Sequence, residues 1–215
     1  MSELAKYKIS NIEWLTDNLL LISFEKYNHL FKAGQHVTLS TIGNYESREY
    51  SIFSGETDGE LTLLIKIVDE GYFTPKLSSL KIGEHMVISK PHGSFSYQTQ
   101  GKGRHWFIAT GTGYAPMNSM IRSNKDVDFK LVHGVRTQKE ALSSVQIDID
   151  KCEICVSRED GKSKYRRVTE YIRIQEFLGD EVFYLCGNGS MVYDCKNLLR
   201  DKGVNPDSIY TEVYF

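Results

Sequence analysis

The hydrophobic pattern changes near residue 100, and this change constrains the fold more than any other feature. In the first half, short segments alternate apolar and polar residues and are separated by Gly, Asn and Asp, with turns expected at Gly43-Asn44 and Asp58-Gly59. Residues 19–24, 35–39 and 61–68 are examples. This spacing is typical of an antiparallel barrel or sandwich. In the second half, apolar strands alternate with helical segments, which indicates a parallel sheet covered by helices.

The 215 residues suit one large or two small domains. We predict an antiparallel Greek-key β-barrel over residues 1–101 and an α/β domain with a parallel sheet over residues 102–215, divided at the glycine-rich segment Gln100-Gly101-Lys102-Gly103. The barrel domain should contain a short helix over residues 74–80, with Thr74 as N-cap and Pro75 at its first position. Helices of the second domain are expected near residues 116–123, 138–144, 169–177 and 190–202.

The composition excludes several classes of function. A formal net charge of −2 gives no broad attraction to nucleic acid. The first residues show no charged-then-apolar leader, and no apolar run approaches the ~20 residues of a membrane helix. We therefore expect a cytoplasmic monomer with no membrane span.

The four cysteines do not predict a metal site. Cys152 and Cys155 form a CxxC pair, but residues 151–156 are strand-like, and no second pair completes a zinc site. The spacing of an iron–sulfur cluster is also missing. Any iron–sulfur centre should therefore lie on a partner protein.

A glycine loop follows the first strand of the second half. Gly111-Thr112-Gly113 falls at the carboxyl end of that strand, where open parallel sheets bind ligands. Glycines there permit a tight turn and the close approach of a phosphate. The loop is not a GxGxxG fingerprint, and on spacing alone a generic strand–turn–helix connection is about as good an interpretation.

Candidate ligand-binding side chains occur in both halves. In a strand, Arg48 and Tyr50 share a face, so that an arginine fork for pyrophosphate stands beside an aromatic ring, although an exposed strand arginine gives the same pattern. Arg136, Arg158, Arg166 and Arg167 follow consecutive strands and should converge on one sheet edge. There they could bind a phosphomonoester or simply form ordinary surface charge.

Five segments in one order resemble the ferredoxin–NADP reductase family. They are Arg48-Glu49-Tyr50-Ser51, Gly71-Tyr72-Phe73-Thr74-Pro75, Gly111-Thr112-Gly113-Tyr114-Ala115-Pro116, Cys186-Gly187-Asn188 and Glu212-Val213-Tyr214-Phe215. The resemblance implies FAD in the first domain and NADP(H) in the second. Gly189 stands where many family members have proline, and Arg166 replaces a usual glycine.

The resemblance also implies roles for individual residues. Arg48 would bind the FAD pyrophosphate near Thr74, and Tyr50 would pack on the flavin. The C-terminal tail would place Tyr214 on the side of the flavin that faces the nicotinamide. Arg136, Arg158 and either Arg166 or Arg167 would bind the 2′-phosphate of NADP(H). The reacting region would comprise Ser51, Cys186 and Glu212. The cofactor-binding candidates are Arg48, Glu49, Tyr50, Ser51, Tyr72, Phe73, Thr74, Gly111, Thr112, Gly113, Val135, Arg136, Ser157, Arg158, Arg166, Arg167, Cys186, Gly187, Asn188, Gly189, Ser190, Asp194, Tyr214 and Phe215.

The function implied by the resemblance is electron exchange between NADPH and a one-electron carrier, ferredoxin or flavodoxin. Two alternatives stay open. One is an NAD(P)H reductase that serves free flavin, a quinone or an oxygenase component. The other is a non-catalytic flavoprotein subunit that only docks a partner.

Overall fold

The computed structural model describes residues 4–25, 30–43, 46–68, 70–98, 103–141 and 149–214. The chain forms two compact units, of which the first comprises residues 1–97 together with Asn118–Asn124 and the second comprises the remainder. The domain boundary predicted after residue 101 lies outside the described residues. Among the described helices, none is both long enough and apolar enough to cross a membrane.

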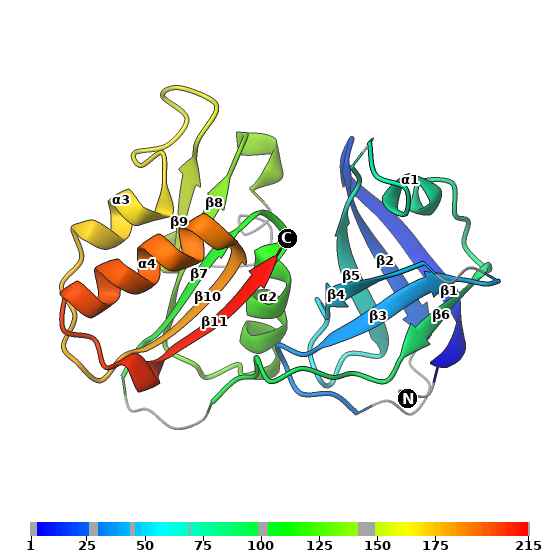
Figure 1. The fold of residues 1–215 in the computed structure, drawn as a ribbon, viewed down its shortest axis with the longest axis horizontal. Helices are drawn as coiled ribbons and strands as arrows, with labels where there is room; N and C mark the ends of the chain where they lie inside the picture. The colour runs from blue at the N-terminus through cyan, green and yellow to red at the C-terminus, as the bar shows by residue number, and fades with distance from the viewer. Residues whose placement is uncertain are drawn as a thin grey trace. The chain divides into compact units, whose positions relative to one another are not determined.

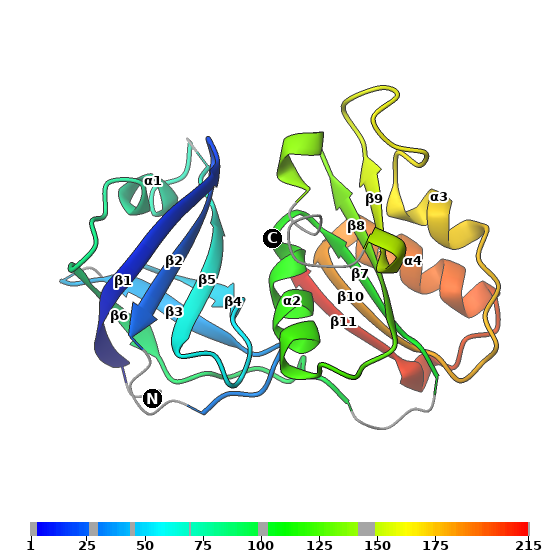
Figure 2. The same ribbon diagram turned by 180° about the vertical axis from the view of Figure 1, so that it is seen from behind.

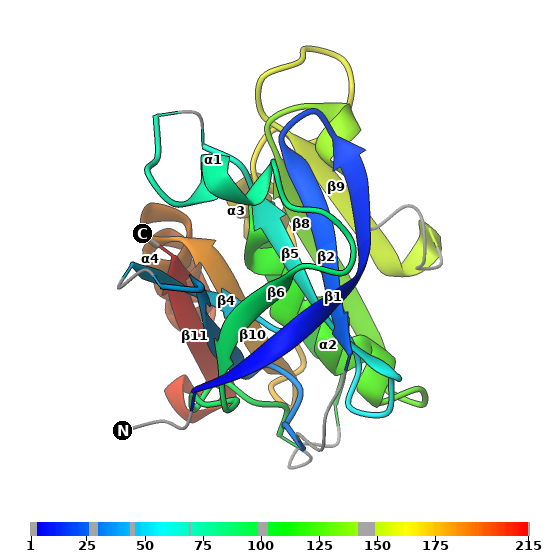
Figure 3. The ribbon, with the colours of Figure 1, turned by 90° about the vertical axis from the view of Figure 1, so that its right-hand side faces the viewer.

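Unit 1 is built on an antiparallel sheet with the strand order β4-β3-β6-β1-β2-β5 (Figures 1 and 3). Its strands are β1 (Leu4–Thr16), β2 (Leu19–Glu25), β3 (His36–Thr41), β4 (Ser47–Ser51), β5 (Glu60–Lys66) and β6 (His85–Ser89). The two edge strands are also linked to each other, because Ile52 forms a bridge with Leu63, and Phe53 N donates to Thr62 O at 2.8 Å. The antiparallel barrel predicted for this half is therefore confirmed.

The core of unit 1 follows from the alternation within its strands. In β2 and β5, Leu20, Ile22, Leu63 and Ile65 are fully buried and pack in one cluster. Residues Asn118–Asn124 add polar contacts to this unit: Asn118 Nδ2 donates to Phe53 O at 2.8 Å. Burial of an amide is tolerated here because its donor is satisfied.

The predicted helix over residues 74–80 is shorter than expected. Helix α1 spans Thr74–Leu77, and its N-cap is Phe73, without a side-chain cap. Thr74 is therefore not the N-cap: its Oγ1 accepts a hydrogen bond from Val68 N at 3.0 Å and lies 3.3 Å from Val68 O. The helix ends early because the Ser78 hydroxyl donates to Pro75 O at 2.6 Å, and such local bonds compete with helix continuation.

Unit 2 contains a parallel sheet with the strand order β11-β10-β7-β8-β9, as its alternating pattern predicted. Its strands are β7 (His105–Thr110), β8 (Phe129–Val135), β9 (Cys152–Val156), β10 (Val182–Asn188) and β11 (Ile209–Tyr214). Helices α3 and α4 cover one face, and the first turns of α2 lie on the other (Figures 1 and 2). The strand that contains the CxxC pair is β9, with Cys155 buried and Cys152 half-buried.

The helices of unit 2 differ in extent from the predictions. They are α2 (Tyr114–Ser123), α3 (Val168–Arg173) and α4 (Gly189–Asp201). The helix expected near residues 138–144 is a single 3-10 turn over Gln138–Glu140, and residues 142–148 lie outside the described part of the chain. Helix α3 ends at Arg173, before the expected residue 177, because the chain turns there and the large apolar side chain of Ile174 is exposed.

Candidate functional site

Strand β4 places the candidate residues of unit 1 on two faces. Its register pairs Arg48 with Leu39 and Tyr50 with Val37, so Arg48 and Tyr50 share one face, while Glu49 and Ser51 occupy the other. Arg48 is exposed, and its Nη1 donates to Ser47 O at 2.8 Å. An exposed guanidinium beside an aromatic ring fits a ligand that joins an anionic group to a flat ring.

Burial defines the chemistry of the aromatic and hydroxyl side chains of β4. Tyr50 packs against the core of unit 1, and this burial raises its pKa to about 12, although the nearby Arg48 opposes the shift. Tyr50 is therefore a neutral phenol at physiological pH. Ser51 is buried.

The segment before α1 separates into a core residue and an exposed one. Phe73 is buried in the core of unit 1, so its ring is a packing residue. Tyr72 is 65% exposed, and Lys76 Nζ lies 3.6 Å from its ring centroid. Lys76 was not among the predicted site residues. Lys76 is half-buried, pairs with Glu46 at 3.6 Å and stands over Tyr72 in a cation–π contact, so it places a cation near a predicted cofactor-binding side chain.

The carboxyl edge of the sheet in unit 2 brings the predicted glycine loops together. A Cβ on Gly113 would lie 2.3 Å from Cys186 O, and a Cβ on Gly187 would lie 2.4 Å from Thr110 Oγ1. Gly187 also has φ +128°, and Gly111 has φ +53°. The end of β7 with its following turn and the end of β10 thus pack closely against each other, which only glycine permits.

Helix α4 begins at this edge with a complete cap. Asn188 Oδ1 accepts from Ser190 N at 3.1 Å and from Met191 N at 3.4 Å, while Asn188 N donates to Thr110 Oγ1 at 3.0 Å. The first turn contains no acidic residue, and Ser190 is exposed. The N-terminus of this 13-residue helix therefore favours an anionic group. Asp194 is exposed one turn further along the same helix.

Cys186, Glu212 and Tyr214 lie on adjacent parallel strands. Cys186 pairs with Glu212 and Asn188 with Tyr214. Cys186 Sγ donates to Glu212 Oε2 at 3.7 Å. Burial, and then the Glu212 carboxylate, raise the pKa of the Cys186 thiol well above its ordinary value, so it stays protonated and is a poor nucleophile. Tyr214 is half-buried, and Phe215 lies outside the described residues.

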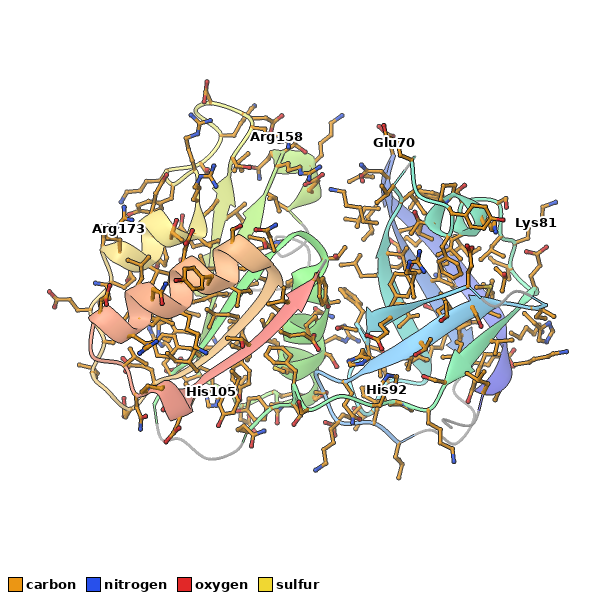
Figure 4. The ribbon with its side chains drawn as sticks, in the orientation of Figure 1. Glu70, Lys81, His92, His105, Arg158 and Arg173 are labelled. Carbon is orange, nitrogen blue, oxygen red and sulfur yellow. The ribbon has the colours of Figure 1, made fainter. Side chains whose placement is uncertain are left out.

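The predicted arginines lie on loops that are bonded to each other. Arg158 N donates to Arg136 O at 2.9 Å, and Ser157 Oγ donates to Val135 O at 3.0 Å. These bonds join the ends of β8 and β9, while the side chains of Arg136 and Arg158 are exposed (Arg158 in Figure 4). Val135 itself is buried, so its side chain is structural.

The structure distinguishes the two arginines between which the sequence could not choose. The Arg166 guanidinium donates to Ser157 O at 3.0 Å and pairs with Asp160 at 3.2 Å. Arg167 is exposed, and its side chain makes no hydrogen bond or ion pair with the described part of the chain. Arg166 therefore stabilises the loop, whereas the exposed Arg167 keeps its donors available for an external anion.

His133 is a residue of this edge that the list of candidates missed. It is buried, its Nε2 donates to Gly111 O at 2.9 Å, and its ring stacks on Tyr114 at 5.1 Å between centroids. Burial lowers its pKa to about 4, so the ring is neutral at pH 7. Its position in the segment His133-Gly134-Val135-Arg136 was the sequence feature that could have identified it. The neutral ring holds the glycine loop in position.

We expect His133 to make the protein less stable as the pH falls. Its folded pKa of about 4 lies below the ordinary 6.5, so its contribution is complete above pH 6.5 and is lost as the pH falls from 6.5 toward 4. Urea unfolding of His133→Gln should show a shallower loss of stability over that range than wild type. His85→Gln, which changes an exposed histidine, should keep the wild-type slope. Parallel curves for wild type and His133→Gln would contradict the assignment.

An Arg48→Ala variant should retain FAD less well. A charge-assisted bond to a phosphate contributes about 2 kcal/mol, equivalent to a roughly thirtyfold change in affinity. Dissociation constants for FAD, measured by flavin fluorescence on the refilled apoprotein, provide the test. Lys81→Ala removes another exposed cation from unit 1 and should bind FAD as wild type does. Equal affinities for FAD in all three proteins would show that Arg48 does not contact FAD.

Residues suited to two dinucleotide cofactors thus occur on separate units: a cation and aromatic pair on unit 1, and a glycine cradle, helix N-terminus and arginines on unit 2. The sequence matches the model of the oxidoreductase FAD-binding domain over residues 7–97 and that of the oxidoreductase NAD-binding domain over residues 107–197. These two domains together define a class of FAD- and nicotinamide-dependent oxidoreductases. The chain belongs to the ferredoxin–NADP reductase family within that class. FAD and a nicotinamide dinucleotide are its cofactors.

Individual relatives come from two functional groups. The chain is 29% identical to the toluate 1,2-dioxygenase electron transfer component of Pseudomonas putida, over 96% of this chain and 66% of that protein. It is 32% identical to a ferredoxin–NADP reductase of Pseudomonas aeruginosa, over 65% of this chain and 58% of that protein. It therefore spans less than two thirds of both relatives. The structure of a ferredoxin NADP+ reductase from Neisseria gonorrhoeae with bound FAD and NADP has the same fold, with a TM-score of 0.83, 20% identity and full coverage of both chains.

Proposed function

We propose that this protein transfers electrons from NADPH through FAD to a one-electron protein carrier, ferredoxin or flavodoxin. The observation that carries the proposal is the pair of loops at the ends of β8 and β9, which present the exposed guanidinium groups of Arg136 and Arg158 from one bonded backbone. A cluster of arginines recognises a phosphomonoester, and NADPH differs from NADH by such a group. FAD, when bound, supplies the conversion between two-electron and one-electron chemistry.

The residues of the chain act by binding and orientation in this proposal. Arg48 would neutralise the pyrophosphate of FAD, with Lys76 beside Tyr72 as a further cation of unit 1, and Tyr50 would cover the flavin ring. The N-terminus of α4 and the glycine loop would hold the dinucleotide of NADPH. Cys186 would pack against the nicotinamide as a neutral thiol, since its pKa is raised and hydride transfer requires no sulfur adduct. Ser51 and Glu212 stay candidates for proton transfer.

A second candidate is a reductase that serves an oxygenase component. The toluate dioxygenase component matches 96% of this chain, against 65% for the ferredoxin–NADP reductase of Pseudomonas aeruginosa, and this broader match favours the alternative. The distinction lies in the electron acceptor and in the nicotinamide cofactor. Neither is determined by the domain pair.

Steady-state assays with purified protein would test the proposal. The visible spectrum should show bound flavin, and NADPH should support reduction of a ferredoxin or a flavodoxin at a higher kcat/KM than free flavin or a quinone. An oxygenase iron–sulfur component as the fastest acceptor would establish the second candidate instead. A protein that does not bind FAD would contradict both.

A further inference from the structure

Three potential metal ligands converge on unit 1: His36, His92 and Glu49, the last on the face of β4 opposite Arg48 and Tyr50. His36 Nε2 lies 3.9 Å from Glu49 Oε1, and His92 Nε2 lies 3.7 Å from the same oxygen. One ligand atom from each residue lies within 4.8 Å of the others, and this is the single group of its kind among the described residues. His92 is labelled in Figure 4. No metal site was predicted from the sequence, because no second cysteine pair accompanies Cys152 and Cys155.

Backbone pairing brings these three residues together. In the β3–β4 register, His36 pairs with Ser51 and Thr38 pairs with Glu49, so His36 and Glu49 are diagonal neighbours on one face. His36 and His92 also form a bridge, with N–H to O distances of 3.0 and 2.9 Å in the two directions. The cluster is therefore fixed by the sheet. It occupies the opposite face of β4 from Arg48 and Tyr50.

Hydrogen bonding orients the His92 ring as a metal ligand requires. Its Nδ1 lies 3.1 Å from Lys90 O, and since a carbonyl only accepts, Nδ1 carries the proton. In the neutral ring, Nε2 then carries the lone pair, and it lies 3.7 Å from Glu49 Oε1. A histidine that donates one ring N–H to a backbone carbonyl and presents the other nitrogen is the usual arrangement around a bound metal. A divalent cation between the Nε2 lone pair and the carboxylate oxygen would satisfy both groups.

The packing around His36 also leaves little freedom. Its ring and that of His92 meet edge to face at 4.3 Å between centroids, and a Cβ on Gly93 would lie 2.7 Å from the His36 ring. Gly93, at φ +107°, therefore permits the backbone to approach this ring closely. The His36 side chain is 17% exposed, whereas that of Glu49 is 65% exposed. The His36 ring is therefore held in place, while the Glu49 side chain can adjust its position.

We propose that His36, Glu49 and His92 bind one divalent transition-metal ion of the Zn²⁺ type, with water as the fourth ligand. Imidazole and carboxylate ligands at about 2.0–2.2 Å in a tetrahedral site stand roughly 3.4 Å apart. The two distances to Glu49 Oε1, 3.9 and 3.7 Å, are close to this value, and all three ligand atoms lie within 4.8 Å of one another, so small side-chain movements would complete the site. Two imidazoles disfavour Mg²⁺ and Ca²⁺, which prefer oxygen ligands. The ion would tie edge strand β4 to β3 and to the segment after β6.

Calorimetric titration of the FAD-containing protein with ZnCl₂, in a buffer that does not chelate metals, would test the proposal. We expect one equivalent to bind to wild type, and at least tenfold weaker binding in each of His36→Gln, His92→Gln and Glu49→Gln. The matched control is His85→Gln, an exposed histidine of β6 outside the cluster, which should bind as wild type does.

Zinc X-ray absorption of wild type provides a measurement that does not depend on any variant folding. Two imidazole nitrogens and oxygen ligands in the first shell are expected. Absence of stoichiometric binding would overturn the proposal, and would leave a protonated His92 paired with Glu49 as the explanation of the cluster. Binding that survives in both His36→Gln and His92→Gln would overturn it as well.

Discussion

Replacement of Arg158 by Ala is expected to weaken NADPH binding about thirtyfold while NADH binding changes little. Loss of one arginine–phosphate contact corresponds to about 2 kcal/mol. The fold should survive, because the loops are joined by the bond from Arg158 N to Arg136 O, which alanine retains. Dissociation constants for NADP⁺ and NAD⁺, measured by flavin difference absorbance, provide the comparison.

The same titration separates the remaining arginines. Arg136→Ala and Arg167→Ala should also lose affinity for NADP⁺ selectively. Arg166→Ala should weaken the binding of both NADP⁺ and NAD⁺, because the Arg166 guanidinium donates to Ser157 O and pairs with Asp160, and these contacts hold the loop. Arg173→Ala, at the exposed end of α3, is the matched control and should behave as wild type. Equal losses for NADP⁺ and NAD⁺ in Arg158→Ala would show that this arginine is structural and would withdraw the main support for NADPH.

Replacement of Gly187 by Ala should be among the most destabilising single changes in unit 2, at about 4 kcal/mol. Its backbone lies at φ +128°, where a side chain costs roughly 1–3 kcal/mol, and the new Cβ would lie 2.4 Å from Thr110 Oγ1. Overpacking of this kind adds about 1–3 kcal/mol. The collision would also separate the ends of β7 and β10, so NADP⁺ binding should fall with stability.

Variants at two other glycines distinguish the cost of the backbone conformation from the cost of the collision. Gly203 has φ +83° with nothing within 4 Å of its Cβ position, so Gly203→Ala should show the backbone cost alone. A Cβ on Gly113 would lie 2.3 Å from Cys186 O, so Gly113→Ala should show mainly the cost of the collision. Urea unfolding of the three variants gives the comparison. A Gly187→Ala variant no less stable than Gly203→Ala would contradict the close packing of the loops.

The hydrophobic pattern and the order of the motifs were sufficient to predict the two-domain architecture. The alternation in residues 19–24 and 61–68 predicted β2 and β5, because the face that a strand residue occupies depends only on its parity. The glycines at 111 and 113 predicted a tight turn, and the structure has Gly111 at φ +53° and leaves no room for a Cβ on Gly113 or Gly187. Cys186, Glu212 and the arginine loops were recognised as segments in order along the chain.

Contacts between distant segments were decided only by the tertiary structure. Thr74 resembled an N-cap, but its hydroxyl bonds Val68, because the turn before α1 brings that backbone within reach. Arg166 and Arg167 could not be told apart until Asp160 and Ser157 were placed beside one of them. His133 acquired its role from Gly111, and His36, Glu49 and His92 met through strand register. Register and loop closure set these distances, and neither is encoded in the spacing of residues along the chain.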